Sequence, residues 1–413
     1  MPDLTTRRSF LFGAACLAAA TLTGCTTRSS RTTTVRSPST PTTSGTPATP
    51  LVPVDCAATE AAGGAEPLWQ TAVKRGLVYG SSTATWQISD PAYRKLYEQE
   101  VAILFTEDDM LWYRVRPSPT SGLKFQYPDQ IVSFAEKNKL LIFGTHLVWD
   151  DGFGTGWNQS DLNNMDKQTA EKYLWGTLDA LVTRYKGRVT AWSTVNEAVD
   201  AFGLRSDVPW YQSIGPSYVA EAFQRAHAAD PNALLVLNEY GFETTDGFTD
   251  PVDKRAATLT VLDQLLADKV PVHALGIQAH LDATYFPDKF NEKAYRQFLA
   301  DVAGRGLRIL VTEMDVLDDT LPPAAGPRDK AVANIYRRYL DVALDEPDVI
   351  SLMTFGLSDR YTWLQEDYPR NDGAPRRPLP FDQKLKPKPA LSALEGALSG
   401  AAQRNLYWKP PRC

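Results

Sequence analysis

The sequence predicts a single-domain α/β fold, a (β/α)8 (TIM) barrel. From about Pro67 onward, short apolar runs alternate with helical stretches, which is the pattern of repeated βαβ units. Eight of these runs have the length and composition of strands. Two of them, in residues 192–197 and 309–315, end in an acidic residue, as expected at the end of a barrel where a site is built. An open doubly wound sheet is the alternative, but no glycine-rich phosphate turn follows the first strand.

Length and composition fit this fold. The chain has 413 residues, enough for one barrel of typically ~250 residues and additional segments. The net charge of −6 is mild, so nothing in the composition points to nucleic acid. We place the barrel domain at residues 61–400 and a C-terminal extension at residues 401–413.

Residues 1–25 have the features of an export signal. Residues 7–8 are a twin-arginine pair, and residues 11–22 form an apolar run. This run is too short to span a bilayer, which takes about 20 apolar residues. Residues 22–25 resemble a bacterial lipobox, whose cysteine becomes the lipidated first residue. We therefore expect an exported protein, lipid-anchored through Cys25 on the outer face of the cell membrane. The alternative is an ordinary cleaved signal and a secreted protein.

A predicted disordered tether and two cysteines flank the barrel. Residues 26–60 are rich in Thr, Ser, Pro and Arg, and such a composition buries too little apolar surface to fold. Cys56 and Cys413 lie at the two ends of the folded part, beyond the cysteines of the signal. The first and last strands of a closed barrel are neighbours, so these ends are expected to lie close together. In an oxidising compartment this pair is a disulfide candidate.

The elements between these ends follow in a regular order. The predicted strands are Gly76–Gly80, Val101–Thr106, Leu140–Thr145, Val189–Val195, Leu234–Asn238, Ala274–Ala279, Arg308–Thr312 and Ile350–Phe355. Helix start signals lie between them: Asp90 and Pro91 form a cap and first turn, and Pro128 and Asp166 begin two other helices. In the stretch from Lys167 to Tyr185, apolar residues recur at helical spacing.

Two glutamates end predicted strands. Glu197 follows the fourth strand and Glu313 the seventh, and the C-terminal ends of the strands are where a (β/α)8 barrel builds its active site. Two carboxyl groups facing one pocket are what glycoside hydrolysis needs, because one protonates the leaving oxygen and the other attacks the sugar or activates water. The alternative is two unrelated surface glutamates. Their joint occurrence at strands four and seven favours the catalytic interpretation.

The sequence resembles glycoside hydrolase family 10, the β-1,4-xylanases, as a divergent member over about residues 67–400. The most specific matches are WSTVNE (192–197), GIQAHL (276–281) and VTEMD (311–315). Weaker matches are FTEDDMLW (105–112), GTHLVW (144–149), NEYGFE (238–243), FGLSDRYTW (355–363) and KPKPAL (386–391). In order and spacing these motifs cover nearly the whole predicted barrel.

The resemblance implies a retaining glycoside hydrolase that cleaves β-1,4-linked xylan or a related polysaccharide. Glu197 would be the acid/base and Glu313 the nucleophile, and Asn196 would hydrogen-bond the 2-hydroxyl of the sugar at the cleavage site. A histidine, His280, would bridge Glu313 and Asp315 and keep the nucleophile ionised. The other implied substrate-binding residues are Glu107 at the more distant glycone subsite, Gln278 in the pocket, the sugar platforms Trp149 and Trp363, and Tyr240 near the nucleophile.

The departures from the family pattern concentrate on the glycone side, where the sugars on the non-reducing side of the cleaved bond are held. Asp108 and Leu111 stand where the family has asparagine and lysine, and Phe355 replaces a tryptophan. Thr145 precedes His146 where the family has histidine before threonine. Because adjacent strand residues point to opposite faces, His146 takes the family histidine's place only if the register shifts. We expect intact chemistry, altered glycone recognition and weak binding of plain linear xylan.

Two other interpretations stay open. The first is a hydrolase of a different β-linked surface or exported polysaccharide, and the second is a polysaccharide-binding lipoprotein without turnover. Retention of the residues of the reacting centre stands against the second. The four histidines form no metal-ligand spacing, so we expect no metal and no cofactor. We also expect a monomer whose partner is a polysaccharide substrate, with membrane contact only through the lipid anchor.

Overall fold

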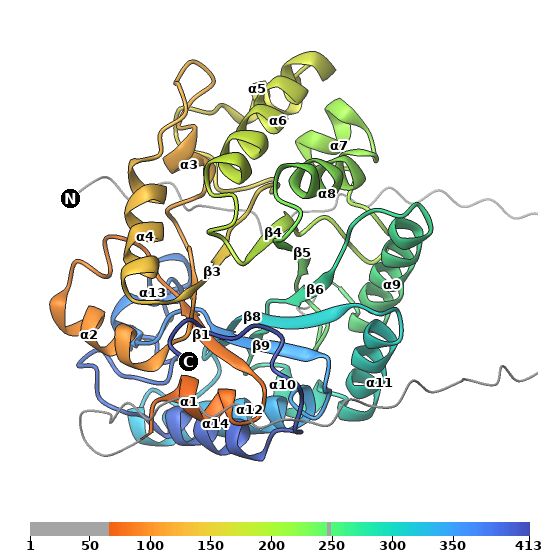
Figure 1. The fold of residues 1–413 in the computed structure, drawn as a ribbon. Coiled ribbons are helices and arrows are strands. Elements are labelled where there is room, and N and C mark those ends of the chain that lie inside the picture. Colours follow the sequence, from red (N-terminus) through yellow and green to blue (C-terminus); the bar gives the residue numbers. More distant parts are fainter. Residues whose placement is uncertain (1–65, 246–248) are drawn as a thin grey trace, which may run out of the picture. The chain divides into compact units, whose positions relative to one another are not determined.

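The computed structural model describes residues 66–245 and 249–413, and its centre is a closed barrel of parallel strands with helices around it (Figure 1). The barrel strands are β1 (Val78–Ser82), β2 (Ile103–Phe105), β3 (Leu141–Gly144), β4 (Ala191–Asn196), β5 (Leu234–Glu239), β6 (Ala274–Ile277), β8 (Arg308–Leu317) and β9 (Val349–Thr354). Each pairs with the next in this order, and β9 pairs with β1 to close the barrel. The predicted (β/α)8 barrel is confirmed. The predicted signal, the tether and Cys56 lie outside the described residues.

The predicted strands are all present, but their ends differ from the prediction, mostly by one or two residues. Two of these differences are informative. The first strand begins at Val78 rather than Gly76, because Gly76 (φ +79°) still belongs to the turn after α1 (Leu68–Val73). The seventh predicted strand runs on from Thr312 to Leu317. This extension has its own partner, the three-residue strand β7 (His280–Asp282), which the sequence analysis did not predict.

Helices fill the connections between strands. Besides α1, they are α2 (Pro91–Glu100), α3 (Trp112–Val115), α4 (Gln126–Lys137), α5 (Gln159–Asn163), α6 (Lys167–Arg184), α7 (Pro209–Ile214), α8 (Tyr218–Ala229), α9 (Pro251–Ala267), α10 (Phe286–Lys289), α11 (Glu292–Ala303), α12 (Ala325–Ala343), α13 (Leu364–Asp367) and α14 (Pro389–Gly400), with a 3-10 turn at Asp359–Tyr361. The predicted caps are present: Asp90 accepts from the backbone N–H of Ala92 at 2.9 Å, and Asp166 from that of Thr169 at 2.7 Å. The helix expected to begin at Pro128 begins two residues earlier, at Gln126.

The core has two layers. Inside the barrel, inward side chains of the strands form one cluster, which includes Phe105, Phe143, Val236 and Leu310. A larger cluster fills the space between the strands and the surrounding helices. Both layers are packed with apolar side chains, and the polar groups of the site lie at the C-terminal ends of the strands.

No helix in residues 66–245 or 249–413 is long and apolar enough to cross a membrane. No group of three or more His, Cys, Asp or Glu side chains within the same ranges is arranged to hold a metal ion.

Candidate active site

Glu197 directly follows β4 and has an uncommon backbone conformation. Its φ is +57°, in the left-handed region that non-glycine residues seldom adopt and that costs about 1–3 kcal/mol. The backbone on both sides is held: its N–H donates to the carbonyl of Asn238 at 3.0 Å, and its carbonyl accepts from Arg205 Nη1 at 3.0 Å. Arg205 is itself paired with Asp150 at 2.8 Å. Strain held in this way is typical of functional positions.

The carboxyl group of Glu197 accepts two hydrogen bonds from neutral donors. Trp149 Nε1 donates to Oε2 at 3.0 Å, and Gln278 Nε2 donates to Oε1 at 2.9 Å. Burial raises the pKa of Glu197, the nearby charge of Glu313 adds to the rise, and the two hydrogen bonds only partly offset it. A carboxyl group in this environment favours its protonated form.

Glu313, on β8, has the opposite environment. Asn238 Nδ2 donates to its Oε1 at 2.7 Å, and His280 Nε2 lies 3.3 Å from its Oε2. Burial alone would raise the pKa of Glu313, but the hydrogen bond and charge of His280 outweigh burial and lower it. This carboxyl group favours its ionised form.

His280 connects Glu313 to a second carboxylate. Its Nδ1 lies 2.8 Å from Asp315 Oδ1, and the other oxygen of Asp315 accepts from Trp363 Nε1 at 2.8 Å. Burial lowers the pKa of His280, but the two carboxylates more than compensate and raise it to about 10. The imidazole is therefore protonated and donates on both sides. The pairing of β7 with the extended β8 creates this contact, because His280 and Asp315 are register partners.

Amide side chains occupy the space between the two glutamates. Asn238 Oδ1 accepts from Thr312 Oγ1 at 2.8 Å, which orients its Nδ2 toward Asn196 Oδ1 at 2.8 Å and toward Glu313. Gln278 Nε2 also reaches Asn196 Oδ1, at 3.3 Å. Asn196 Nδ2 is buried and has no hydrogen-bond partner among the described residues. Among these amide side chains, Asn196 Nδ2 is thus left as a free donor beside the two carboxyl groups.

The glycone-side residues lie at the ends of neighbouring strands. Glu107, after β2, accepts from Ser82 Oγ at 2.8 Å. Leu111 is only 8% exposed and offers no polar atom from its side chain. His146 contacts the inward Phe105 and Trp149, with ring centroids 6.2 and 5.1 Å apart. Because β3 ends at Gly144, the strand alternation that we applied to His146 no longer holds there, and its ring faces the barrel interior.

Most predicted site residues thus lie in one connected set of contacts. Tyr240 is placed beside Lys254, whose Nζ is 4.8 Å from the ring centroid, and its proximity to the nucleophile stays a prediction. Asn238 was not predicted as a site residue, although it belongs to an Asn-Glu pair at the C-terminal end of β5, as Asn196 does at the end of β4. Arg205 was not predicted either, because no local sequence pattern indicates its contacts with Glu197 and Asp150.

Comparisons with known proteins agree with this geometry. Residues 68–397 match the family model for glycosyl hydrolase family 10. The chain is 30% identical over 315 residues to endo-1,4-beta-xylanase B of Thermotoga neapolitana, covering 75% of this chain and 84% of that protein. Its structure is similar to xylanase 10B of Thermotoga maritima, with a TM-score of 0.71, 29% identity, and coverage of 81% of this chain and 98% of that chain. It is also similar to xylanase 10B of Thermotoga petrophila RKU-1 in complex with xylobiose, with a TM-score of 0.71 and 29% identity. That match covers 81% of this chain and 97% of that chain. The chain therefore belongs to glycosyl hydrolase family 10 and is a glycoside hydrolase.

Proposed function

We propose that this hydrolase cleaves β-1,4-linked xylan with net retention, using Glu197 as the acid/base and Glu313 as the nucleophile. The observation that carries the proposal is that the surroundings of the two carboxyl groups shift their pKa values in opposite directions. The pKa of Glu197 is raised by burial, and the pKa of Glu313 is lowered by protonated His280. Pairs of titratable groups whose pKa values are pushed apart identify the acid and the base of a site.

The first chemical step forms a glycosyl ester. An Oε atom of Glu313 attacks the anomeric carbon while the bond from this carbon to the leaving oxygen breaks. Glu197 gives its proton to that oxygen, so the leaving sugar departs as an alcohol. Asn196 Nδ2, a buried donor without a partner in the described part of the chain, is available to the 2-hydroxyl of the reacting sugar. Such a contact strengthens as positive charge develops on the ring.

The second step reverses the roles. Glu197, now ionised, takes a proton from water while the water oxygen attacks the anomeric carbon and the ester bond to Glu313 breaks. Two inversions at the same carbon give net retention. Protonated His280 donates to Glu313 and stabilises it as the leaving carboxylate.

Xylan is the proposed substrate because the similar proteins are named xylanases. The glycone side gives a reason to test other β-linked polysaccharides too. Leu111 brings an apolar side chain to the position of the family lysine, and Asp108 accepts from Trp86 Nε1 at 3.0 Å. We expect plain linear xylan to bind more weakly than a substrate with an apolar substituent at this subsite, which would appear as a higher KM rather than a lower kcat.

The stereochemistry of the first product tests the proposal. Purified protein is given xylan, and proton NMR follows the anomer that appears before mutarotation. We expect the β-anomer, and kcat lower by about 10²–10⁴-fold for Glu197→Gln. A first-formed α-anomer would contradict the retaining mechanism. A panel of other β-linked polysaccharides runs in parallel, and cleavage of one of these without cleavage of xylan would contradict the proposed substrate.

A further inference from the structure

Three consecutive residues after β1 bind three consecutive acids after β2. Thr85 donates to Asp109 through its backbone N–H at 2.7 Å and its hydroxyl at 2.9 Å. Trp86 Nε1 donates to Asp108 Oδ2 at 3.0 Å, and Gln87 Nε2 donates to Glu107 Oε1 at 3.2 Å. The pairs run in antiparallel order, so the two loops are fastened along their length at the C-terminal end of the barrel.

Trp86 differs from the other members of this set in its exposure. The side chains of Gln87, Asp108 and Asp109 are nearly fully buried, whereas Trp86 is 41% exposed. Its ring is also held from a second side. Tyr361, in the loop after β9, lies edge-to-face against it at 5.3 Å and 87°, and the Tyr361 hydroxyl donates to Asp90 at 2.9 Å. The indole is therefore fixed by residues from two other barrel loops and still reaches solvent.

A fixed, partly exposed aromatic ring suits sugar binding. The pyranose ring of a xylose has apolar C–H faces that pack on an aromatic face, and a ring that is already held loses little conformational entropy when it binds. Single exposed apolar side chains are common on protein surfaces and need no function. Here, however, Trp86 is joined through Asp108 and Gln87 to Glu107, the residue at the more distant glycone subsite. Trp86 therefore lies beside the residues of the proposed glycone subsite.

We propose that Trp86 is an aromatic platform for the sugar next beyond the one at Glu107, and that Asp108 is the residue that positions it. This inference rests on the proposed function, because it takes the occupant to be the glycone end of the same xylan chain. It also accounts for an acid at position 108. The indole N–H is a donor only, and a carboxylate is an acceptor only, so Asp108 meets it with either oxygen. The acid orients the platform rather than replacing the family asparagine as a sugar contact.

The test measures how activity depends on the length of the glycone. The substrates are aryl β-glycosides of xylobiose and xylotriose, which differ by the sugar assigned to Trp86. The readout is the ratio of kcat/KM for the trioside to that for the bioside. We expect Trp86→Ala to lower this ratio by about three- to tenfold, the size of a typical aromatic contact. Trp86→Phe, which keeps a ring, should recover part of the loss.

A variant of Asp108 tests its positioning role, and a variant of a distant aromatic residue serves as the control. Asp108→Ala should lower the ratio as well, and should add nothing to Trp86→Ala in the double variant. The matched control is Tyr407→Ala, since Tyr407 is 44% exposed but lies beside Arg308, at the opposite end of β8 from the site. It should keep the wild-type ratio. An unchanged ratio in Trp86→Ala, including an equal loss on both substrates, would overturn the platform. A wild-type enzyme inactive on the bioside would instead overturn the proposed function.

Discussion

The two glutamates of the site differ in the groups that surround them rather than in their own chemistry. Glu197 receives its hydrogen bonds from an indole and an amide, which carry no charge. Glu313 lies against His280, whose positive charge is maintained by Asp315. The proposed mechanism requires a protonated Glu197 and an ionised Glu313, so the rate should fall at acid pH as Glu313 is protonated and at alkaline pH as Glu197 ionises.

Because the charge of Glu313 helps to raise the pKa of Glu197, Glu313→Gln should lower the pKa of Glu197. The expected sign follows from like-charge repulsion, which disfavours ionisation of the second carboxyl group. Carbon-13 NMR of protein labelled at the glutamate carboxyl carbons gives the titration directly. Glu107→Gln serves as the control, and it should leave the Glu197 titration in place. A pKa of Glu197 that is unchanged or higher in Glu313→Gln would refute the coupling.

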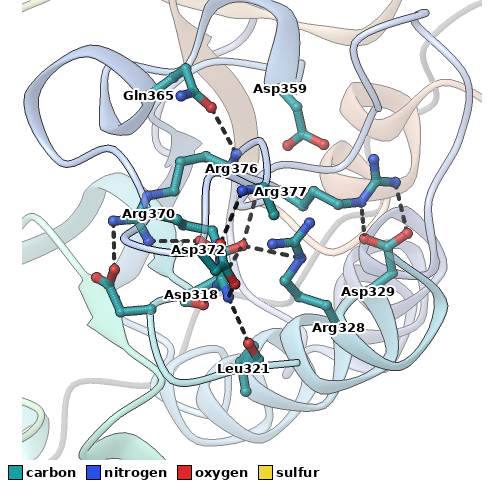
Figure 2. Close-up of polar contacts among 12 residues, drawn as sticks. Asp318, Leu321, Arg328, Asp329, Asp359, Gln365, Arg370, Asp372, Arg376 and Arg377 are labelled. Carbon is teal, nitrogen blue, oxygen red and sulfur yellow. Dashed lines mark hydrogen bonds and ion pairs between the residues drawn. The ribbon is translucent and has the colours of Figure 1, made fainter. Parts of the chain in front are cut away.

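At the scale of elements, the loop after β9 carries aromatic rings to the site. Trp363 donates to Asp315 at 2.8 Å and lies edge-to-face against Tyr368, with ring centroids 5.4 Å apart. The same loop continues into a buried network of arginines and aspartates, which fastens it to the end of β8 (Figure 2). The strand that carries Glu313 and the loop that carries Trp363 are thus tied together.

Asp318 is the centre of this network. It is fully buried, and Arg376 Nη1 donates to its Oδ1 at 2.9 Å. Its Oδ2 accepts from the backbone N–H of Arg377 at 3.2 Å and lies 3.5 Å from Arg328 Nε (Figure 2). The side chain of Arg370 donates to its backbone carbonyl. The negative charge of this one carboxylate therefore stabilises the positive charges of three buried arginines, Arg328, Arg370 and Arg376.

We expect Asp318→Asn to be strongly destabilising, because buried Arg328 loses the acid beside it. Arg370 and Arg376 each lose one of the two acids with which they pair. A loss of about 3–5 kcal/mol in the free energy of unfolding is typical of breaking a buried ion pair. Urea denaturation measures it. The matched control is Asp372→Asn, because the Asp372 side chain is 31% exposed and pairs with Arg370 at 2.5 Å. This change should cost much less, since solvent screens the pair. Equal losses of unfolding free energy in the two variants would show that the buried Asp318 stabilises the network no more than the exposed Asp372 does.

The elements also show where prediction from sequence succeeds and where it stops. The eight strands and the two strand-end glutamates follow from short apolar runs, each ending in polar residues, which are visible within each segment by itself. Strand β7 has only three residues, too few for an alternating pattern, and so the extension of β8 that pairs with it was not predicted. The contact of Trp86 with Asp108 joins residues 22 positions apart, and its formation depends on how two loops fold.

At the scale of the whole molecule, the end of the barrel opposite the site is closed by both ends of the described chain. Trp69, from α1, packs with the inward side chains of the strands, and Trp408 packs against the same cluster. Arg404 is 5% exposed and donates to the backbone carbonyl of Val349 at 2.5 Å. Arg412 lies over the ring of Trp69, 5.7 Å from its centroid. Residues near the C-terminus thus pack against the base of the barrel.

This closure bears on the cysteine pair. Cys413 is disulfide-bonded and packs against the core at the base of the barrel. Its predicted partner, Cys56, lies outside the described residues, so the pairing stays a prediction. A bridge between them would close a very long loop, and the chain-entropy model then gives about 6 kcal/mol of stabilisation.

Titration of free thiols in denatured, unreduced mature protein should therefore find none beyond any contributed by Cys25. Thermal unfolding should also shift to a lower temperature when the bridge is removed, since the unfolded chain regains the entropy that the cross-link restricts. Cys56→Ser, Cys413→Ser and the double variant should show the same shift, because either change alone already breaks one bridge. Two additional reactive thiols in the wild-type protein, or a Cys413→Ser variant that differs from Cys56→Ser, would contradict this pairing.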